Sequence, residues 1–288
     1  MIIVKIYGGM ANQLFQYAAG YALSLHHATA LKIDSSYFQE KNRDTKRTFA
    51  LDKFNIDYEL ASQYEIDQLF KFRTIDYAWN KCMPISKKRF YGEKKPGYNE
   101  QFFDLPDTVY LRGYFQSEKY FIDCQKSLLK QFQLESNTLK PILPLAEMLN
   151  NSNSIALHVR LGDYLNPTLS SIMAPFDITY YQRAIDHFQQ NIMHPTFYVF
   201  SDQIHLAKDL LKLDAEFVFV DEKLSANSDE DFYLMQSCQH QIIANSTFGW
   251  WAAYLNKHTH KIVVAPQKWY KDHFGDATDL YPNNWVVL

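Results

Sequence analysis

Short apolar runs alternate with amphipathic stretches along much of this 288-residue chain, a pattern typical of an α/β protein. The first apolar run ends at Gly8-Gly9 and predicts a strand followed by a tight turn. Apolar positions three and four residues apart then predict a helix over residues 12–27, and a second strand is expected over residues 30–33. The chain therefore opens as strand, glycine turn, helix and strand.

The second half of the chain repeats this alternation more regularly. Strands are expected over residues 155–159, 196–200, 217–220, 241–244 and 261–265, and helices over residues 179–191, 206–211, 231–238 and 249–255. Parallel strands joined by helices form a doubly wound, Rossmann-like sheet. We expect such a sheet in the second half.

A domain boundary is expected near the middle of the chain. Between residues 34 and 137 the periodicity is weak, and it predicts only helices near 63–70 and 117–130 and a strand over 108–114. Pro141, Pro144 and the polar run 150–154 are typical of a connection between domains. We therefore expect two domains, residues 1–145 and residues 146–288.

The composition narrows the class of protein. With 29 Lys and Arg against 32 Asp and Glu, the net charge is −3, which is not the basic balance of a dedicated nucleic-acid binder. The 46 aromatic residues suit sugar faces as well as a core, and most are expected in the core. Six Lys or Arg residues lie between Lys81 and Lys95, which indicates either a solvated face or contact with an anionic lipid-linked acceptor or membrane surface.

Cysteine and apolar content indicate the compartment. Three widely spaced cysteines without a CxxC motif favour buried thiols in a reducing compartment. The first apolar run reads as a strand, not as a signal peptide, and no run approaches the roughly 18 residues that span a bilayer. Asp229-Glu230-Asp231 lies where a helix begins, a position that favours carboxylates without any metal, so no metal is expected.

The first candidate site follows the strand over residues 155–159. Side chains two residues apart in a strand share a face, so His158 and Arg160 are expected side by side. An imidazole and a guanidinium fork suit a phosphate or a pyrophosphate. Asp163 is expected on the loop above, where an ion pair with Arg160 would instead stabilise the loop. Both interpretations remain open on this motif alone.

Two further candidates end other strands. Asp202 follows one strand and would bind a base or a ribose hydroxyl, or cap the loop, and local chemistry favours the cap. Asn245, Ser246 and Thr247 separate a strand from a helix, whose free amides would bind an anion unless Ser246 or Thr247 caps them. Since ligands of such sheets lie outside the carboxyl ends of the strands, a nucleotide diphosphate explains the three candidates together.

A dinucleotide fold is an alternative for the first domain. The turn at residues 7–13 follows a strand, and Asp34 ends the next strand. The G-x-G-x-x-G spacing is absent, however, which argues against NAD.

Four stretches of the sequence resemble glycosyltransferase family 11, the GDP-fucose-dependent α-1,2-fucosyltransferases. They are residues 8–17, 158–164, 200–202 and 231–251, in the family's order. The resemblance implies a GT-B fold, in which two Rossmann-like domains face each other across a cleft and the C-terminal one holds most of the donor. It also implies metal-independent, inverting transfer of L-fucose from GDP-β-L-fucose to the 2-hydroxyl of a terminal galactose.

The resemblance assigns roles to individual residues. Arg160 matches the family's essential arginine and is expected to stabilise the leaving phosphate, and Asp163 is the first candidate for the general base. Gly9, Asn12 and Gln13 are expected to position the fucose or the acceptor. The residues expected to contact the donor are His158, Arg160, Asp202, Asn245, Ser246, Thr247 and Phe248.

Three positions depart from the family pattern. Leu161 stands where a second arginine is usual, Ala11 where glycine is usual, and Gly249 where serine is usual. Leu161 removes one positive charge near the donor and leaves Arg160 alone to neutralise the phosphate.

The expected partners are GDP-fucose and a galactose-terminated glycan, lipid-linked by analogy with bacterial members, with no cofactor and no nucleic acid. The resemblance places the protein in the cytoplasm, at most peripheral to the inner membrane face. Two alternatives remain open. One is a GDP-sugar transferase of different linkage, and the other, from a different class, is a non-catalytic carbohydrate-binding protein.

Overall fold

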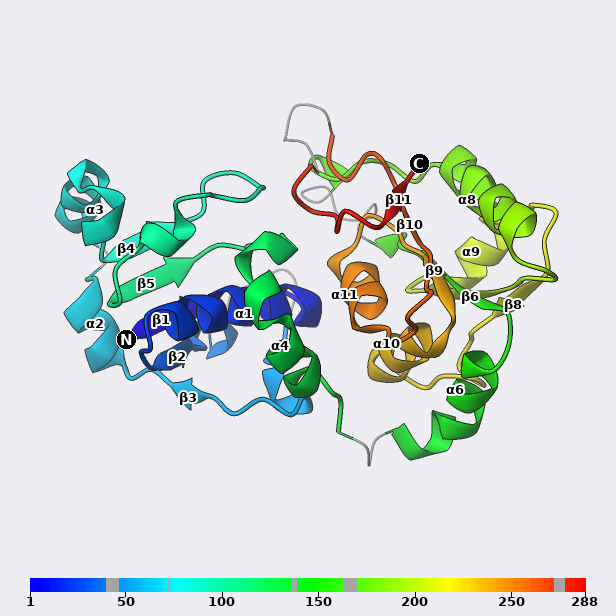
Figure 1. Cartoon of the computed structure of the whole chain (residues 1–288), viewed down its shortest axis with the longest axis horizontal. Helices are drawn as coiled ribbons and strands as arrows, with labels where there is room; N and C mark the ends of the chain where they lie inside the picture. Colours follow the sequence, from blue (N-terminus) through cyan, green and yellow to red (C-terminus); the bar gives the residue numbers. More distant parts are fainter. Residues whose placement is uncertain (40–46, 72, 136–138, 163–169, 272–277) are drawn as a thin grey trace. The chain divides into compact units, whose positions relative to one another are not determined.

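The computed structural model describes residues 1–39, 47–71, 73–135, 139–162, 170–271 and 278–288 (Figure 1). The chain divides into two compact units. Unit 1 comprises Met1–Gln133 and Thr278–Leu280, and unit 2 comprises Leu134–Ala277 and Tyr281–Leu288. The expected boundary at residue 145 falls inside helix α6 (Leu143–Asn150), because Pro144 lies in the first turn of this helix and does not form a linker.

Unit 1 is built on a five-stranded parallel sheet with the order β3-β2-β1-β5-β4. Its strands are β1 (Ile2–Lys5), β2 (Leu31–Asp34), β3 (Glu59–Leu60), β4 (Phe90–Gly92) and β5 (Val109–Arg112). Its helices are α1 (Met10–His26), α2 (Gln63–Leu69), α3 (Thr74–Cys82) and α4 (Gln125–Gln131). Helix α1 packs against β1 and β2, while Ile3 and Tyr110 pack with α2.

Unit 2 contains a six-stranded parallel sheet with the order β8-β7-β6-β9-β10-β11. Its strands are β6 (Ser154–Val159), β7 (Thr196–Ser201), β8 (Phe217–Phe219), β9 (His240–Ile242), β10 (Val263–Ala265) and β11 (Val286–Val287). Besides α6, its helices are α8 (Ile178–Asn191), α9 (Ile204–Leu210), α10 (Ser228–Ser237) and α11 (Thr247–Leu255).

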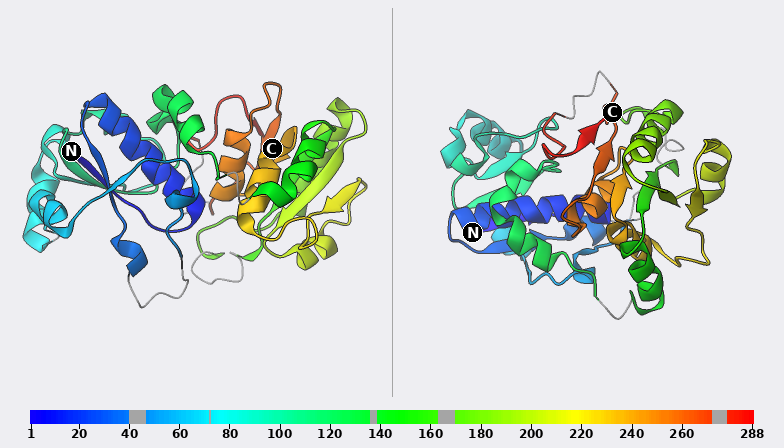
Figure 2. Two further views of the ribbon diagram at one scale, coloured as in Figure 1. Left: turned by 90° about the horizontal axis from the view of Figure 1, so that it is seen from below. Right: turned by 45° about the vertical axis from the view of Figure 1, so that its right-hand side comes forward.

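Alternating side chains of β6 divide between the two faces of this sheet. Ile155, Leu157 and Val159 are fully buried in a core shared with α8 and α9, and His158 points to the opposite face, against α11. Figures 1 and 2 show the sheet between α8 and α9 on one side and α10 and α11 on the other. The period-two pattern of the sequence is therefore confirmed at the strand that carries the first candidate motif.

The strand order of unit 2 determines where a ligand is expected to bind. From β6 the chain proceeds outward through β7 to β8, and it then returns to β9 on the other side of β6. This is the Rossmann order, in which the direction of winding reverses between the first and fourth strands. Ligands of such sheets bind outside the carboxyl ends of the strands at this reversal, here those of β6 and β9.

Most expected helices and strands are confirmed, with a few differences. The expected helix over residues 117–130 is broken into two 3₁₀ turns and the shorter α4, while α3 and the two-residue β11 were not expected. Cys82 at the end of α3 is exposed, contrary to the expectation of buried thiols, whereas Cys238 is buried. None of the described helices is long and apolar enough to cross a bilayer.

Candidate functional site

His158 is a buried, neutral imidazole at the carboxyl end of β6. Its side chain is almost inaccessible, and its Nδ1 has no hydrogen-bond partner among the described residues. Burial, and to a lesser extent the nearby charge of Arg160, lowers the pKa of His158 to about 3. The imidazole is therefore uncharged at neutral pH.

The absence of a side chain at position 249 makes room for this imidazole. A Cβ atom on Gly249 would lie 2.6 Å from Nδ1 of His158, closer than a real Cβ contact. The His158 ring also lies 5.8 Å from the ring of Phe248. The glycine that departs from the family pattern thus brings the first turn of α11 directly against His158.

The N-terminus of α11 is left without a side-chain cap. Ser246 is the N-cap residue, with φ of −142° and ψ of 129°, but its side chain makes no capping hydrogen bond, and the first turn holds no acidic residue. The first backbone N–H groups of a helix have no partner within it. The interpretation of Ser246 or Thr247 as an ordinary cap is not supported, and the amides of Thr247, Phe248 and Gly249 form an electropositive end.

Arg160 forms an ion pair with Asp202, whose partner the sequence left open. Nη1 of Arg160 lies 3.2 Å from Oδ2 of Asp202, and both side chains are about a quarter exposed. Asp202 also accepts hydrogen bonds from the backbone N–H groups of Leu161 at 3.0 Å and Gly162 at 2.9 Å. The expected loop cap is confirmed at Asp202, which ties the turn after β6 to the end of β7 and orients Arg160.

Asn245 holds two distant segments of unit 2 together. Its side-chain nitrogen donates to the carbonyl oxygen of Ala174 at 2.9 Å and to that of Trp269 at 3.1 Å. Both hydrogens of this amide are therefore used within the protein. The expected donor contact, if made through the Asn245 nitrogen, is not available in this arrangement.

The general-base candidate Asp163 lies outside the described residues, and its role stays a prediction. Of the other residues expected at the donor, unit 2 brings His158 and Phe248 together at the N-terminus of α11, with Gly249 against the His158 ring. Arg160 and Asp202 end the strands β6 and β7, which pair along their whole lengths.

Gln13, expected to position a sugar, is a structural residue of unit 1. It is fully buried, and its Nε2 donates to the carbonyl oxygens of Gly8 at 3.0 Å and Thr48 at 2.8 Å. Its Oε1 accepts from the N–H of Ala50 at 2.9 Å. The Gln13 amide is committed to holding the glycine turn, where Gly8 adopts a φ of +80°, so a direct sugar contact through this amide is not available in this arrangement, and a positioning role through the turn stays a prediction.

Asn12 and Gly9 lie at the carboxyl edge of the unit 1 sheet, where the strands end. Oδ1 of Asn12 accepts from Nε2 of Gln116 at 3.0 Å, which links the turn after β1 to the loop after β5. Gly9 is the N-cap residue of α1, and a Cβ there would have only the tip of Arg47 nearby, at 3.9 Å. These two positions remain candidates for sugar contacts.

Three tyrosines gather at the same edge, and sequence reasoning did not select them. The ring of Tyr7 lies 4.9 Å from that of Tyr114 and 5.9 Å from that of Tyr37. Each follows a different strand of the sheet, so only the topology brings them together. The available signal was the position of each tyrosine just past a strand end.

Glu93 holds the backbone of the tyrosine cluster at Tyr114. It follows β4, and its carboxylate accepts from the N–H of Tyr114 at 2.7 Å and from that of Phe115 at 3.2 Å. Burial raises the pKa of Glu93 to about 7, although these two hydrogen bonds act in the opposite direction. The sequence did not indicate that Glu93 is a buried carboxyl group, because it is followed by lysines of a charged segment.

Asp34 does not have the free carboxylate that a dinucleotide site needs. It is buried, its Oδ2 accepts from the hydroxyl of Tyr110 at 2.5 Å, and its Oδ1 accepts from the N–H of Ser36 at 2.9 Å. These bonds explain a carboxylate at the end of β2 without any ribose.

The acidic run at residues 229–231 begins α10, as expected. Its Glu230 accepts from the N–H of Ala226 at 2.7 Å, and burial raises the pKa of Asp231 to about 6. Among the residues that the structure describes, no group of three His, Cys, Asp or Glu side chains could hold a metal ion.

Comparison with known proteins gives the family. The sequence model of glycosyl transferase family 11 matches residues 1–288. An O-antigen biosynthesis glycosyltransferase, WbnK, of Escherichia coli is 30% identical, over 98% of each chain. An α-1,2-colitosyltransferase of Escherichia coli is also 30% identical, over 100% of this chain and 99% of the relative.

Solved structures show the same fold. The fucosyltransferase FUT1 of Arabidopsis thaliana, in complex with GDP, superimposes with a TM-score of 0.57 at 13% identity, over 98% of this chain and 75% of that one. The fucosyltransferase NodZ from Bradyrhizobium gives a TM-score of 0.50 at 14% identity, over 87% and 91%. The GT-B fold class, with two parallel α/β sheets, is confirmed. The chain is a glycosyltransferase and belongs to glycosyltransferase family 11.

Proposed function

We propose that this enzyme transfers L-fucose from GDP-β-L-fucose to the 2-hydroxyl of a terminal galactose, with inversion at the anomeric carbon. The observation that carries the proposal is the set of groups at the winding reversal of unit 2. Arg160, the neutral His158 and the uncapped N-terminus of α11 all lie at the carboxyl ends of β6 and β9. This set suits a nucleotide diphosphate.

The chemistry follows from where charge develops. The acceptor oxygen forms a bond to the anomeric carbon as the bond from that carbon to the β-phosphate oxygen breaks, so negative charge grows on the departing GDP. Fixed donors aimed at this phosphate lower the barrier by about 3 kcal/mol each in comparable sites. Arg160, held by Asp202, and the amides of α11 are placed to act in this way.

A base must take the proton of the acceptor hydroxyl, and we propose Asp163 for this role. Asp163→Asn should bind GDP as the unchanged protein does and transfer almost no sugar. Loss of GDP binding in this variant would instead make Asp163 a structural residue of the donor site.

We assign the acceptor to the carboxyl edge of the unit 1 sheet. The clustered rings of Tyr7, Tyr37 and Tyr114, of which Tyr114 is exposed, combine an apolar ring with a polar hydroxyl, which suits the C–H face of a galactose ring. Asn12 and Gly9 border the same edge and supply polar groups for sugar hydroxyls. Lipid linkage of the acceptor is part of the proposal.

Transfer should not require a metal ion. Arg160 and the helix end supply the positive charge that a divalent cation would otherwise provide at the diphosphate. Activity is expected to persist in EDTA. A strict requirement for an added divalent ion would contradict this and would direct attention to Asp229 and Asp231.

GDP-colitose is a second candidate donor, because a relative that matches the whole chain is named an α-1,2-colitosyltransferase. The decisive experiment incubates the enzyme with GDP-fucose or GDP-colitose and a panel of galactosides, and determines the product linkage by NMR. We expect an α-1,2-linked fucosyl galactoside. A different linkage, or turnover with GDP-colitose alone, would overturn the proposal, and a failure to bind GDP in calorimetry would favour a carbohydrate-binding protein.

A further inference from the structure

The outer surface of α3 in unit 1 combines exposed apolar side chains with excess positive charge. Ile75 and Trp79, one helical turn apart, are 57% and 65% exposed, and Tyr64 on α2 is 72% exposed. No residue of α3 is buried. In a chain whose other four tryptophans are buried, the exposure of Trp79 is unusual.

The opposite side of α3 explains how the helix is attached to unit 1. The ring of Tyr77 lies 4.9 Å from that of Phe70 and 5.3 Å from that of Phe90. The side chain of Asn80 donates to the carbonyl oxygen of Phe90 and accepts from the N–H groups of Arg89 and Phe90. Tyr77 and Asn80 attach the helix to the described part of unit 1, whereas the side chains of Ile75 and Trp79 are mostly exposed.

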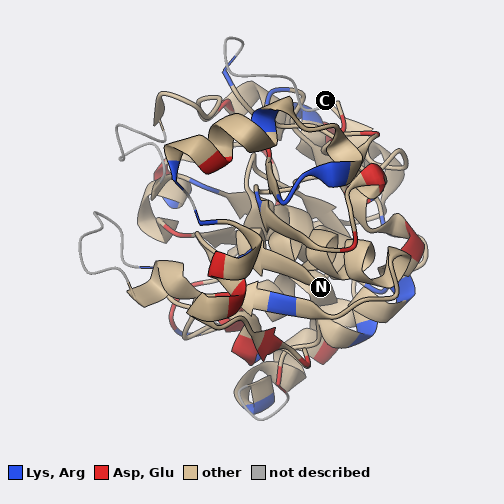
Figure 3. Ribbon diagram, turned by 90° about the vertical axis from the view of Figure 1, so that its left-hand side faces the viewer, with Lys and Arg blue, Asp and Glu red and all other residues tan. Residues whose placement is uncertain are grey.

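Basic residues surround these apolar side chains. Residues 71–95 contain eight Lys or Arg and two acidic residues, a net charge of +6 in a chain whose net charge is −3. Figure 3, which looks at unit 1 from the side of α2 and α3, shows Lys and Arg in blue on α3 and on the segment that follows it. This surface is therefore a local cationic region on an acidic protein.

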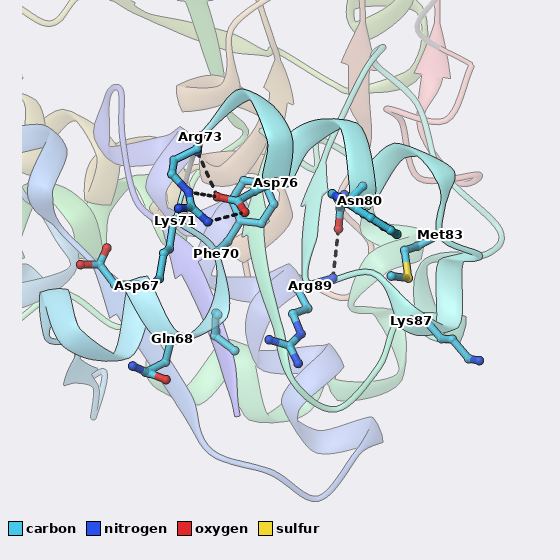
Figure 4. A pocket seen from close by; sticks show the side chains of 12 residues that line it. Asp67, Gln68, Phe70, Lys71, Arg73, Asp76, Asn80, Met83, Lys87 and Arg89 are labelled. Atoms are coloured by element: carbon cyan, nitrogen blue, oxygen red, sulfur yellow. Dashed lines mark hydrogen bonds and ion pairs between the residues drawn. The ribbon is translucent and has the colours of Figure 1, made fainter.

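A cavity of about 250 Å³ opens beside α3, between it and α2. Its lining includes Trp79 and four cationic side chains, those of Lys71, Arg73, Lys87 and Arg89 (Figure 4). Arg73 is paired with Asp76, at 3.0 Å. Across the described part of the chain, no carboxylate forms an ion pair with Lys71, Lys87 or Arg89.

We propose that this α3 surface, formed by Ile75, Trp79, Lys71, Lys87 and Arg89, docks on a membrane of anionic lipid. Indole and aliphatic side chains insert at the depth of the headgroups, and lysine and arginine attract the negative surface. An exposed apolar pair with positive charge around it is the combination that membrane-surface helices present to a bilayer of anionic lipid. Docking there would bring the enzyme to acceptors carried on lipid.

The test uses the full chain and vesicles of phosphatidylcholine alone or mixed with phosphatidylglycerol, without any sugar nucleotide. Binding in this assay is independent of the donor and acceptor proposed above, so its failure would leave the proposed function intact. We expect co-sedimentation with the anionic vesicles only, weakening as salt is raised. No preference for the anionic vesicles would overturn the proposal.

Substitutions identify the surface. The double variant Lys87→Glu, Arg89→Glu and the double variant Ile75→Ser, Trp79→Ser should each weaken vesicle binding about tenfold or more. The matched controls lie on exposed positions of unit 2: Lys212→Glu, Lys223→Glu for charge and Met193→Ser for apolar exposure. If the controls weaken binding as much as the α3 variants, docking on this surface is disproved. Thermal unfolding of all variants checks that they are folded.

Tryptophan fluorescence supplies a second readout, because Trp79 is the exposed tryptophan and Trp250, Trp251, Trp269 and Trp285 are buried. Anionic vesicles should shift the emission to shorter wavelength, and Trp79→Phe should abolish the shift while retaining binding. The same shift caused by raising protein concentration without vesicles would show that a second copy of the chain covers this surface, which would overturn the proposal.

Discussion

The two sheets of the molecule share a plan and differ in what stands at their carboxyl edges. In each sheet, the first strand along the chain lies at the point where the direction of winding reverses. In unit 1 helix α1 follows this strand, and in unit 2 helix α11 follows its neighbour β9. In unit 2 this edge presents Arg160, together with an imidazole nitrogen and a helix end that have no side-chain partner among the described residues. In unit 1 the corresponding turn is filled by the protein's own glutamine.

This difference teaches that topology places a site and side chains decide its ligand. Gln13 and Gln16 occupy the polar groups of the unit 1 turn, and three tyrosines cover the adjacent edge. That surface is aromatic, which suits a sugar ring, whereas the unit 2 edge is electropositive, as a diphosphate needs.

The largest expected effect is at Arg160. Arg160→Lys keeps the charge and loses the planar fork, so kcat for fucose transfer should fall about 100-fold or more. Steady-state kinetics measures the effect, and Arg183→Lys on α8 is the matched control. Near-normal turnover in Arg160→Lys would show that the guanidinium fork is not needed for transfer. The proposed difference in ligand between the carboxyl edges of units 1 and 2 would then lose its main support.

Gln13 provides the reverse case in unit 1. Gln13→Ala leaves the N–H of Ala50 and two carbonyl groups without their partner, so the free energy of unfolding should fall by about 2–3 kcal/mol. GDP affinity should not change, since we propose that the donor binds unit 2. Urea unfolding and calorimetry measure the two quantities, with the exposed Gln101→Ala as control. Weaker GDP binding in a folded Gln13→Ala protein would contradict the assignment.

Gly249 tests the contact between α11 and β6. Gly249→Ala places a methyl group against Nδ1 of His158, which should reduce the free energy of unfolding by about 2 kcal/mol and weaken GDP binding. Ser246→Ala is the control, because an ordinary N-cap serine contributes about 1 kcal/mol and this one makes no capping bond. Substantial destabilisation by Ser246→Ala without GDP would mean that the helix end is capped after all.

The last prediction concerns the pH dependence of stability, to which Glu93 contributes, rather than activity. Its folded-state pKa of about 7 lies above the ordinary 4.5, so between these values the folded protein holds a proton that the unfolded chain has lost. The free energy of unfolding should therefore decline as pH rises from about 4.5 to 7, by about 3 kcal/mol from this group. Asp231 contributes in the same direction at lower pH.

Glu93→Gln should remove the part of this decline that lies nearest neutral pH. Urea unfolding at several pH values measures it, with the exposed Glu100→Gln as control. An unchanged pH profile in Glu93→Gln would show that this carboxyl group titrates normally, and that the edge of unit 1 is less buried than described.

The sequence predicted the elements of unit 2 well because strong local patterns define them. Alternation in 155–159 identified the face of His158, and the break after the apolar run 241–244 identified the start of α11. The cluster of Tyr7, Tyr37 and Tyr114 could not be predicted from the sequence, since these residues are brought together only by the strand order. The structural role of Gln13 could not be predicted for a similar reason, because its partners Thr48 and Ala50 lie far along the chain. Helix α3 was not predicted from the sequence, because its apolar residues are exposed.

The position of GDP in a crystal structure of its complex with this enzyme tests the central claim most directly. The β-phosphate should lie within hydrogen-bonding distance of the Arg160 guanidinium and of the amides of Thr247, Phe248 and Gly249, at the carboxyl ends of β6 and β9. GDP bound at the carboxyl edge of unit 1, or in unit 2 away from these groups, would contradict it.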